Sequence, residues 1–84
     1  IMQETVLEQI IDLENAFKNG GIYFMEYLSK KRLLRIKIDY EIELRLDQAM
    51  SLLVRNKISK EQYNTYKSNL ENSKQYYKRR LANT

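Results

Sequence analysis

Residues 34–46 read LRIKIDYEIELRL, so that apolar and charged side chains alternate strictly over thirteen positions. Strict alternation is typical of a β-strand with one buried face. The same stretch also favours a helix, because Leu, Arg, Lys and Glu have high helix propensities and no turn signal separates them from the residues that follow. The fold depends on which of these two structures forms.

The helical interpretation gives this part of the chain two apolar faces. The first is a continuous stripe at spacings of four and three residues, made up of Leu34, Ile38, Ile42, Leu46, Ala49 and Leu53. The second is made up of Ile36, Tyr40 and Leu44. A helix that is apolar on two faces belongs at the centre of a bundle or in the contact of a dimer. We therefore predict an all-α fold, with three or four helices in a small bundle that forms a single domain over residues 1–84.

The alternative is a strand over residues 34–46. The chain offers this strand no obvious partner, so it would have to pair with its own copy in a dimer. Such an arrangement is similar to the ribbon-helix-helix repressors. In it, Glu41 and Glu43 would be poorly suited to face DNA phosphates.

Start and stop signals define a first helix. Thr5 and Glu8 fit a capping box, and apolar side chains follow at helical spacing. The chain contains two glycines, the adjacent Gly20 and Gly21, and Gly20 can adopt the left-handed conformation that ends a helix.

A second set of signals lies at residues 52–63, which read LLVRNKISKEQY. Asn56 can serve as a helix stop, and Ser59 with Gln62 forms a capping box for a last helix that reaches about residue 80. The chain over about residues 49–70 resembles the short helical hairpins called SHOCT modules, which occur in phage and mobile-element proteins. The matching positions are Ile58, Ser59, Glu61, Tyr63, Lys67 and Leu70. The resemblance implies an accessory oligomerisation or binding element.

The size and composition of the chain suggest that it associates with itself. A chain of 84 residues buries only about 60% of the surface that its unfolded form exposes, so its core is marginal. It has no cysteine and no histidine, which excludes disulfides, thiolate or imidazole metal ligands and a histidine base. We therefore expect a homodimer, and we place its interface at Phe24, Leu34, Ile38, Ile42, Leu46 and Leu53.

The net charge of +4 is distributed in blocks. One basic cluster contains Lys30, Lys31, Arg32, Arg35 and Lys37, and a second contains Lys74, Lys78, Arg79 and Arg80 with Tyr76 and Tyr77 interleaved. Cations spaced along phosphates, with aromatic groups between them, are what nucleic-acid binding requires. The two clusters are therefore candidate nucleic-acid contacts, although an acidic protein surface would attract them as well.

Little in the sequence indicates catalysis. On a helix, Asp39, Glu43 and Asp47 would share one face, where three carboxylates could hold Mg²⁺ or Ca²⁺, but we expect a solvated acidic face instead. No phosphate-binding glycine loop and no nucleophile motif is present. We predict a protein that is not an enzyme and has no catalytic residue, metal or cofactor.

Two functions fit these features. The first is a DNA-associated accessory or regulatory protein, encoded by a phage or plasmid, that contacts phosphates through the two basic clusters. The second is a protein-binding module, such as an inhibitor or assembly factor, that acts through its tyrosines and charge blocks. The sequence has no run of about 18 apolar residues and no charged-then-apolar leader, so we expect a cytoplasmic protein without a membrane span.

Overall fold

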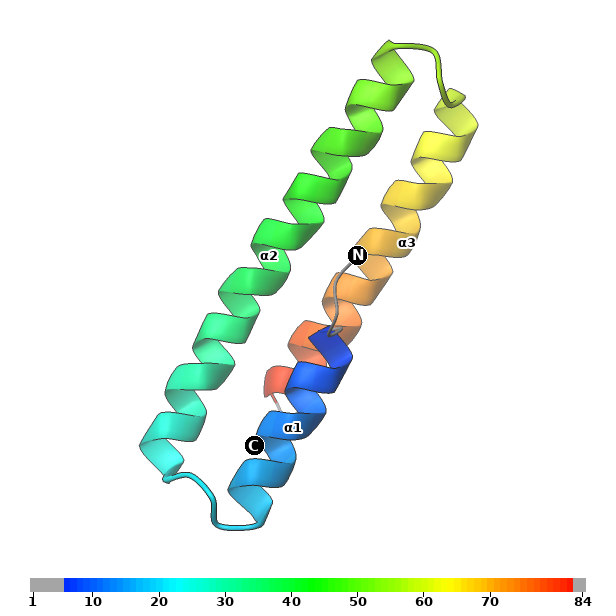
Figure 1. Cartoon of the computed structure of the whole chain (residues 1–84). Coiled ribbons are helices and arrows are strands. Elements are labelled where there is room, and N and C mark those ends of the chain that lie inside the picture. The colour runs from blue at the N-terminus through cyan, green and yellow to red at the C-terminus, as the bar shows by residue number, and fades with distance from the viewer. Residues whose placement is uncertain (1–5, 83–84) are drawn as a thin grey trace.

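The protein is a bundle of three helices in a computed structural model that describes residues 6–82 (Figure 1). Helix α1 spans Val6–Lys18, α2 spans Phe24–Val54 and α3 spans Lys60–Ala82. No strand occurs within residues 6–82, so the prediction of a helix over residues 34–46 is confirmed and the strand alternative is wrong. None of the three described helices is both long enough and apolar enough to cross a bilayer.

Residues 34–46 are helical because one of their two apolar faces is covered within the same chain. The core contains Ile10 of α1, Ile38 and Ile42 of α2, and Leu70 and Leu81 of α3. A helix satisfies its own backbone hydrogen bonds, whereas a strand here would leave them without a partner in the chain. The alternating apolar residues of this stretch therefore lie on two opposite sides of one helix.

Both turns end a helix in the same way. Gly20 has a φ of 75° and Asn56 a φ of 58°, the left-handed conformation expected at a helix C-terminus. At the second turn, the N–H of Asn56 donates to the carbonyl of Leu53 at 3.0 Å and the N–H of Lys57 donates to that of Leu52 at 2.8 Å. The predicted helix stops at Gly20 and Asn56 are thus confirmed. The predicted capping box at Thr5 includes a residue outside the described range.

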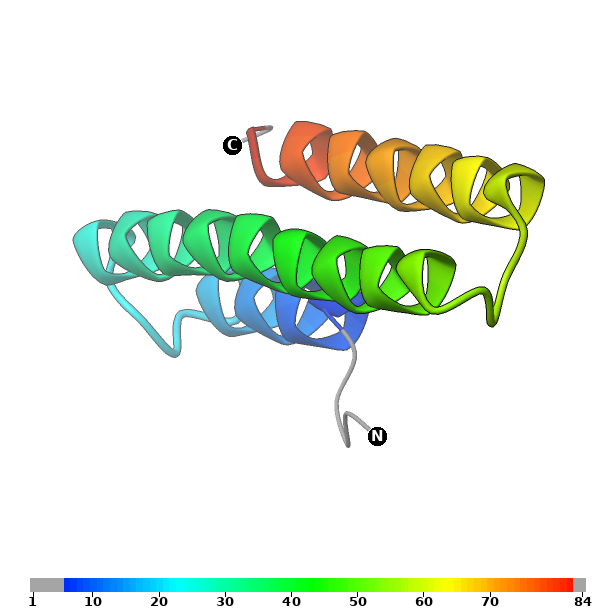
Figure 2. The same cartoon turned by 90° about the horizontal axis from the view of Figure 1, so that it is seen from above.

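The helices differ greatly in length, and this difference shapes the molecule. Helix α1 has 13 residues and α2 has 31, so α1 is about 20 Å long and α2 about 46 Å. Helix α3 runs antiparallel to α2 along most of its length, while α1 lies beside only the first part of α2 (Figures 1 and 2). The bundle therefore has three helices at one end and two at the other.

Candidate functional site

The first basic cluster is largely engaged inside the chain. Lys31 is 3% exposed, and its Nζ lies 5.0 Å from the centre of the Tyr27 ring. Burial, with a smaller effect from the Arg35 charge, lowers the pKa of Lys31, and the Glu14 carboxylate opposes this shift. A side chain in this position is not available to a phosphate.

The neighbouring lysines also have partners within the chain. Lys30 forms an ion pair with Glu26 one turn earlier, at 3.3 Å, and Lys37 donates a hydrogen bond to Gln9 of α1 at 3.1 Å. Arg32 is exposed, and it has no ion-pair or hydrogen-bond partner among the described residues.

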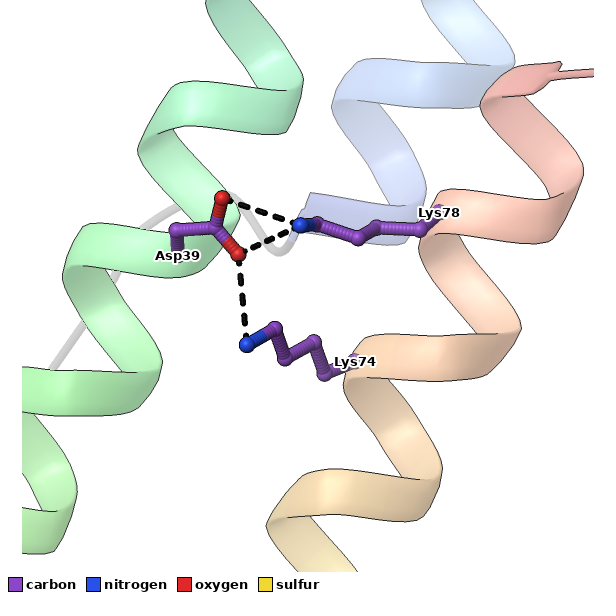
Figure 3. Close-up of polar contacts among 3 residues, drawn as sticks. All are labelled: Asp39, Lys74 and Lys78. Carbon is purple, nitrogen blue, oxygen red and sulfur yellow. Dashed lines mark hydrogen bonds and ion pairs between the residues drawn. The ribbon is translucent and has the colours of Figure 1, made fainter.

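The second basic cluster holds α3 against α2 through Asp39 (Figure 3). Lys78 Nζ lies 2.7 Å from one carboxylate oxygen of Asp39 and 2.9 Å from the other, and Lys74 Nζ lies 3.5 Å from the first oxygen. The hydrogen bond from Lys78 and the charges of both lysines lower the pKa of Asp39, against a smaller opposing effect of burial. These two cations therefore neutralise an acid of their own chain.

Arg80 joins α3 to α1. Its guanidinium contacts the Glu14 carboxylate at 3.1 Å and donates to the Tyr76 hydroxyl at 3.3 Å. The bond to Glu14, followed by that to Tyr76, raises the pKa of Arg80. Tyr77 packs against the core, so it is not free to stack on a base, whereas Arg79 is exposed and without a partner in the described part of the chain.

The residues predicted to form the dimer interface mostly face the inside of one chain. Ile38 and Ile42 are buried, Leu34 and Leu46 pack against the core, and Leu53 is half-buried. Phe24 is exposed and lies beside Phe17, with the ring centres 5.9 Å apart. In this fold α1 and α3 cover the stripe that we had assigned to a second copy, so a contact between copies would use another face of α2.

The acidic residues of α2 do not form a metal site. Asp39 is engaged with Lys74 and Lys78, and no group of three carboxylates within residues 6–82 is arranged to hold a metal ion. The three-carboxylate arrangement considered for Asp39, Glu43 and Asp47 therefore has no counterpart in the described structure.

A groove opens between α2 and α3 where α1 ends. Its volume is about 340 Å³, and its apolar lining is formed by Ala49, Leu52, Ile58 and Tyr66. Arg45, Gln48 and Gln62 supply its polar lining. Ala49 is buried at the floor, whereas Leu52 and Tyr66 are each 40% exposed. We take this groove as the candidate functional site.

The groove adjoins the surface of α2 and α3 on which α1 packs. Val6, the first residue of α1, lines a small hollow together with Ile42, Arg45 and Leu70. Arg45 lines both this hollow and the groove, so the two adjoin along the same side of α2 and α3. The surface beyond α1 is thus lined by apolar side chains, like the surface that α1 covers.

Parts of this groove were predictable from the sequence, but the groove itself was not. Ala49 lies on the predicted apolar stripe and Ile58 among the SHOCT-like positions, yet the space between α2 and α3 depends on how far α1 reaches along them. The signal that could have revealed it is the unequal length of the helices, since α1 spans only Val6–Lys18 whereas α2 continues to Val54.

No protein-family model, curated protein or solved structure matches this chain. The function is therefore inferred from the residues of the chain itself.

Proposed function

We propose that this protein is a non-enzymatic protein-binding module that accepts an amphipathic helix in the groove beyond α1. The observation that carries this proposal is the open groove lined by Ala49, Leu52, Ile58 and Tyr66, which continues the surface that α1 covers. An amphipathic helix that lays its apolar face into a groove of this kind is a common mode of protein recognition. The SHOCT-like hairpin at residues 49–70 supplies the apolar lining of this groove, and its expected role as a binding or oligomerisation element agrees with the proposal.

The chemistry of the groove also suggests which helix it would bind. Its floor is apolar, and its polar lining combines one cation, Arg45, with the amides of Gln48 and Gln62. A ligand helix should therefore carry a narrow apolar stripe flanked by Asp or Glu on the side of Arg45.

The test compares two neighbouring positions of α2. Leu52 lines the groove and is 40% exposed, whereas Met50 is 42% exposed and lines none of the described hollows. A photoreactive amino acid at position 52, introduced into the protein in its native cells, should give a discrete cross-linked partner that is missing when the probe is at position 50. With the probe kept at position 52, Tyr66→Glu on the opposite wall of the groove should then abolish capture of the same partner. Equal labelling from both positions, or none from position 52, would contradict the proposal.

A second candidate function, contact with DNA phosphates, rests on three exposed arginines. Arg32, Arg35 and Arg79 have no hydrogen-bond or ion-pair partner within residues 6–82, and the chain carries a net charge of +4. Three phosphate contacts per chain predict that log K falls with log salt with a slope of about −2.7 per chain.

The DNA proposal is tested by titrating duplex DNA at several salt concentrations. Replacement of Arg32, Arg35 and Arg79 by Ala should flatten the slope while the helical circular dichroism stays unchanged. The matched control replaces Lys18, Lys57 and Lys60, which are exposed elsewhere on the chain. Absence of duplex binding at 50 mM salt would rule this function out.

A further inference from the structure

Helix α2 carries a second apolar face on the side away from the core. Leu33, Ile36, Tyr40 and Leu44 are 63%, 59%, 67% and 43% exposed, respectively. Their spacings of three and four residues place them along one side of the helix, over a length of about 16 Å. Ile38, between Ile36 and Tyr40 in the sequence, faces the opposite side and is buried. We call these four residues the outer stripe.

An exposed apolar surface of this kind requires an explanation. Four large side chains at these exposures present an apolar patch on the order of 400 Å², within the range at which patches on small proteins mark interaction sites. The stripe lies apart from the groove beyond α1, because none of its residues lines that groove. It is therefore a separate surface from the one in the proposed function.

The charges at the two ends of the outer stripe identify its occupant. Arg32 adjoins its first residue, and Glu43 and Asp47 lie at its far end. All three are exposed, and none has an ion-pair partner among residues 6–82. Within the described part of the chain, the outer stripe thus has an unpaired positive charge at one end and two unpaired negative charges at the other.

We propose that the outer stripe is the contact of an antiparallel homodimer, in which α2 of one copy packs against α2 of the other. A two-fold axis through the middle of the stripe, beside residues 38 and 39, places Leu33 of each copy opposite Leu44 of the other. The same axis places Arg32 of each copy between Glu43 and Asp47 of the other. A parallel pair would instead place Arg32 beside its own copy, with repulsion at both ends.

The size of the contact fits a weak, reversible dimer. Two outer stripes of about 400 Å² each, with their charged ends, bury on the order of 1,000 Å², which lies below the range of about 1,200–2,000 Å² of stable specific interfaces and within that of transient ones. Such a dimer also supplies the extra burial that a chain of 84 residues lacks. The dissociation constant should lie in the micromolar range.

The first test is sedimentation equilibrium between about 1 and 500 μM. The wild type should pass from 10.2 kDa to twice that mass as concentration rises. Ile36→Glu and Tyr40→Lys should each raise the dissociation constant at least ~30-fold, since each position occurs twice in the contact. Tyr76→Glu is the matched control, because Tyr76 is exposed on α3, and it should leave the dissociation constant unchanged.

The second test fixes the orientation by charge reversal. Arg32→Glu alone, and Glu43→Arg with Asp47→Arg, should each weaken self-association, because each creates like charges opposite one another in its own homodimer. An equimolar mixture of the two variants should associate as tightly as the wild type, since every reversed charge then meets its complement. A strict monomer at 500 μM, a mixture no tighter than its components, or a dimer that is lost with Leu52→Glu but kept with Ile36→Glu would each overturn the proposal.

Discussion

Asp39 is held in its charged form by lysines from a different helix. Its two oxygens lie 2.7 and 2.9 Å from Lys78 Nζ, and Lys74 approaches one of them at 3.5 Å. The pair lies 39 residues apart in the sequence, and it exists because α3 runs antiparallel to α2 in one register. Lys74 and Lys78 of the second basic cluster therefore hold α3 against α2.

The Asp39 contacts predict a dependence of stability on acid. The pKa of Asp39 is lower in the folded chain than the usual value near 4, so its stabilisation is present above about pH 4 and is lost as pH falls through the folded pKa. Because the carboxylate is 46% exposed, solvent screening limits the effect to about 1 kcal/mol. Asp39→Asn should lower the free energy of urea unfolding by this amount at pH 7 and by much less at pH 2.5.

The control for this prediction is Asp47→Asn. Asp47 is exposed and has no ion-pair partner in the described part of α1, α2 or α3, so its replacement should change monomer stability little at either pH. Equal losses for the two variants would mean that Lys74 and Lys78 do not stabilise the fold through Asp39.

For Lys31 we expect the opposite effect on stability, because burial of its charge destabilises the folded chain. Its pKa is lowered chiefly by burial, so the cost is fully present below the folded pKa and falls as pH rises toward the unfolded value near 10.4. Lys31→Met should raise the free energy of unfolding by about 1 kcal/mol at pH 7, and the gain should shrink as the pH rises through the folded pKa. Lys30→Met, which removes an exposed ion pair, is the control. A loss of stability in Lys31→Met would show that the contacts with Tyr27 and the attraction of Glu14 outweigh burial.

At the scale of the elements, α3 begins with the capping box that the sequence predicts. The N–H of Ser59 donates to the Gln62 side-chain oxygen at 2.8 Å, and the N–H of Gln62 donates to the Ser59 hydroxyl oxygen at 3.0 Å. Both contacts depend on residues three positions apart, which is why local sequence was sufficient to find them.

The capping box predicts a measurable loss when it is removed. Ser59→Ala should lower the free energy of unfolding by about 1 kcal/mol, since the backbone N–H of Gln62 loses the hydroxyl oxygen that accepts its hydrogen bond. Urea denaturation followed by circular dichroism measures the loss. Ser68→Ala, at an exposed position inside the same helix, should have no such cost. If the two variants are equally stable, the capping box does not contribute to the fold.

Helix boundaries were predictable from sequence, but the pairing of helices was not. Gly20, Asn56 and Ser59 carry their conformational preferences in their own side chains, and each lies where the sequence placed a boundary. The partners of Lys78 and Arg80 depend on the register between helices, which no local pattern encodes. For this reason the two basic clusters had the appearance of candidate nucleic-acid contacts, whereas most of their cations bind acids or amides of the same chain.

At the scale of the whole molecule, one apolar face of α2 is buried and the other is exposed. The face with Ile38 and Ile42 is covered by α1 and α3, and the outer stripe remains exposed. The alternating sequence of residues 34–46 predicts both apolar faces, but it does not indicate which of them α1 and α3 cover. That choice follows from the positions of the turns at Gly20 and Asn56, which fold α1 and α3 back onto the same side of α2 (Figure 1).

This division predicts that neighbouring substitutions act on different properties. Ile38 is 2% exposed, so Ile38→Ala leaves a cavity and should lower the free energy of unfolding by about 2–4 kcal/mol. A domain of this size has little stability to spare, and the midpoint of thermal unfolding should fall by at least 10 °C. Tyr40→Ala, two residues away on the outer stripe, should leave unfolding of the dilute monomer within about 0.5 kcal/mol of the wild type.

Protein concentration separates the two effects. The thermal midpoint of the wild type should rise with concentration as dimer forms, and Tyr40→Ala should abolish this rise. Ile38→Ala should lower the midpoint at every concentration, because the core that it damages lies inside one chain. If Tyr40→Ala destabilises the dilute monomer as much as Ile38→Ala does, the outer stripe is part of the core and α2 does not carry two separate faces.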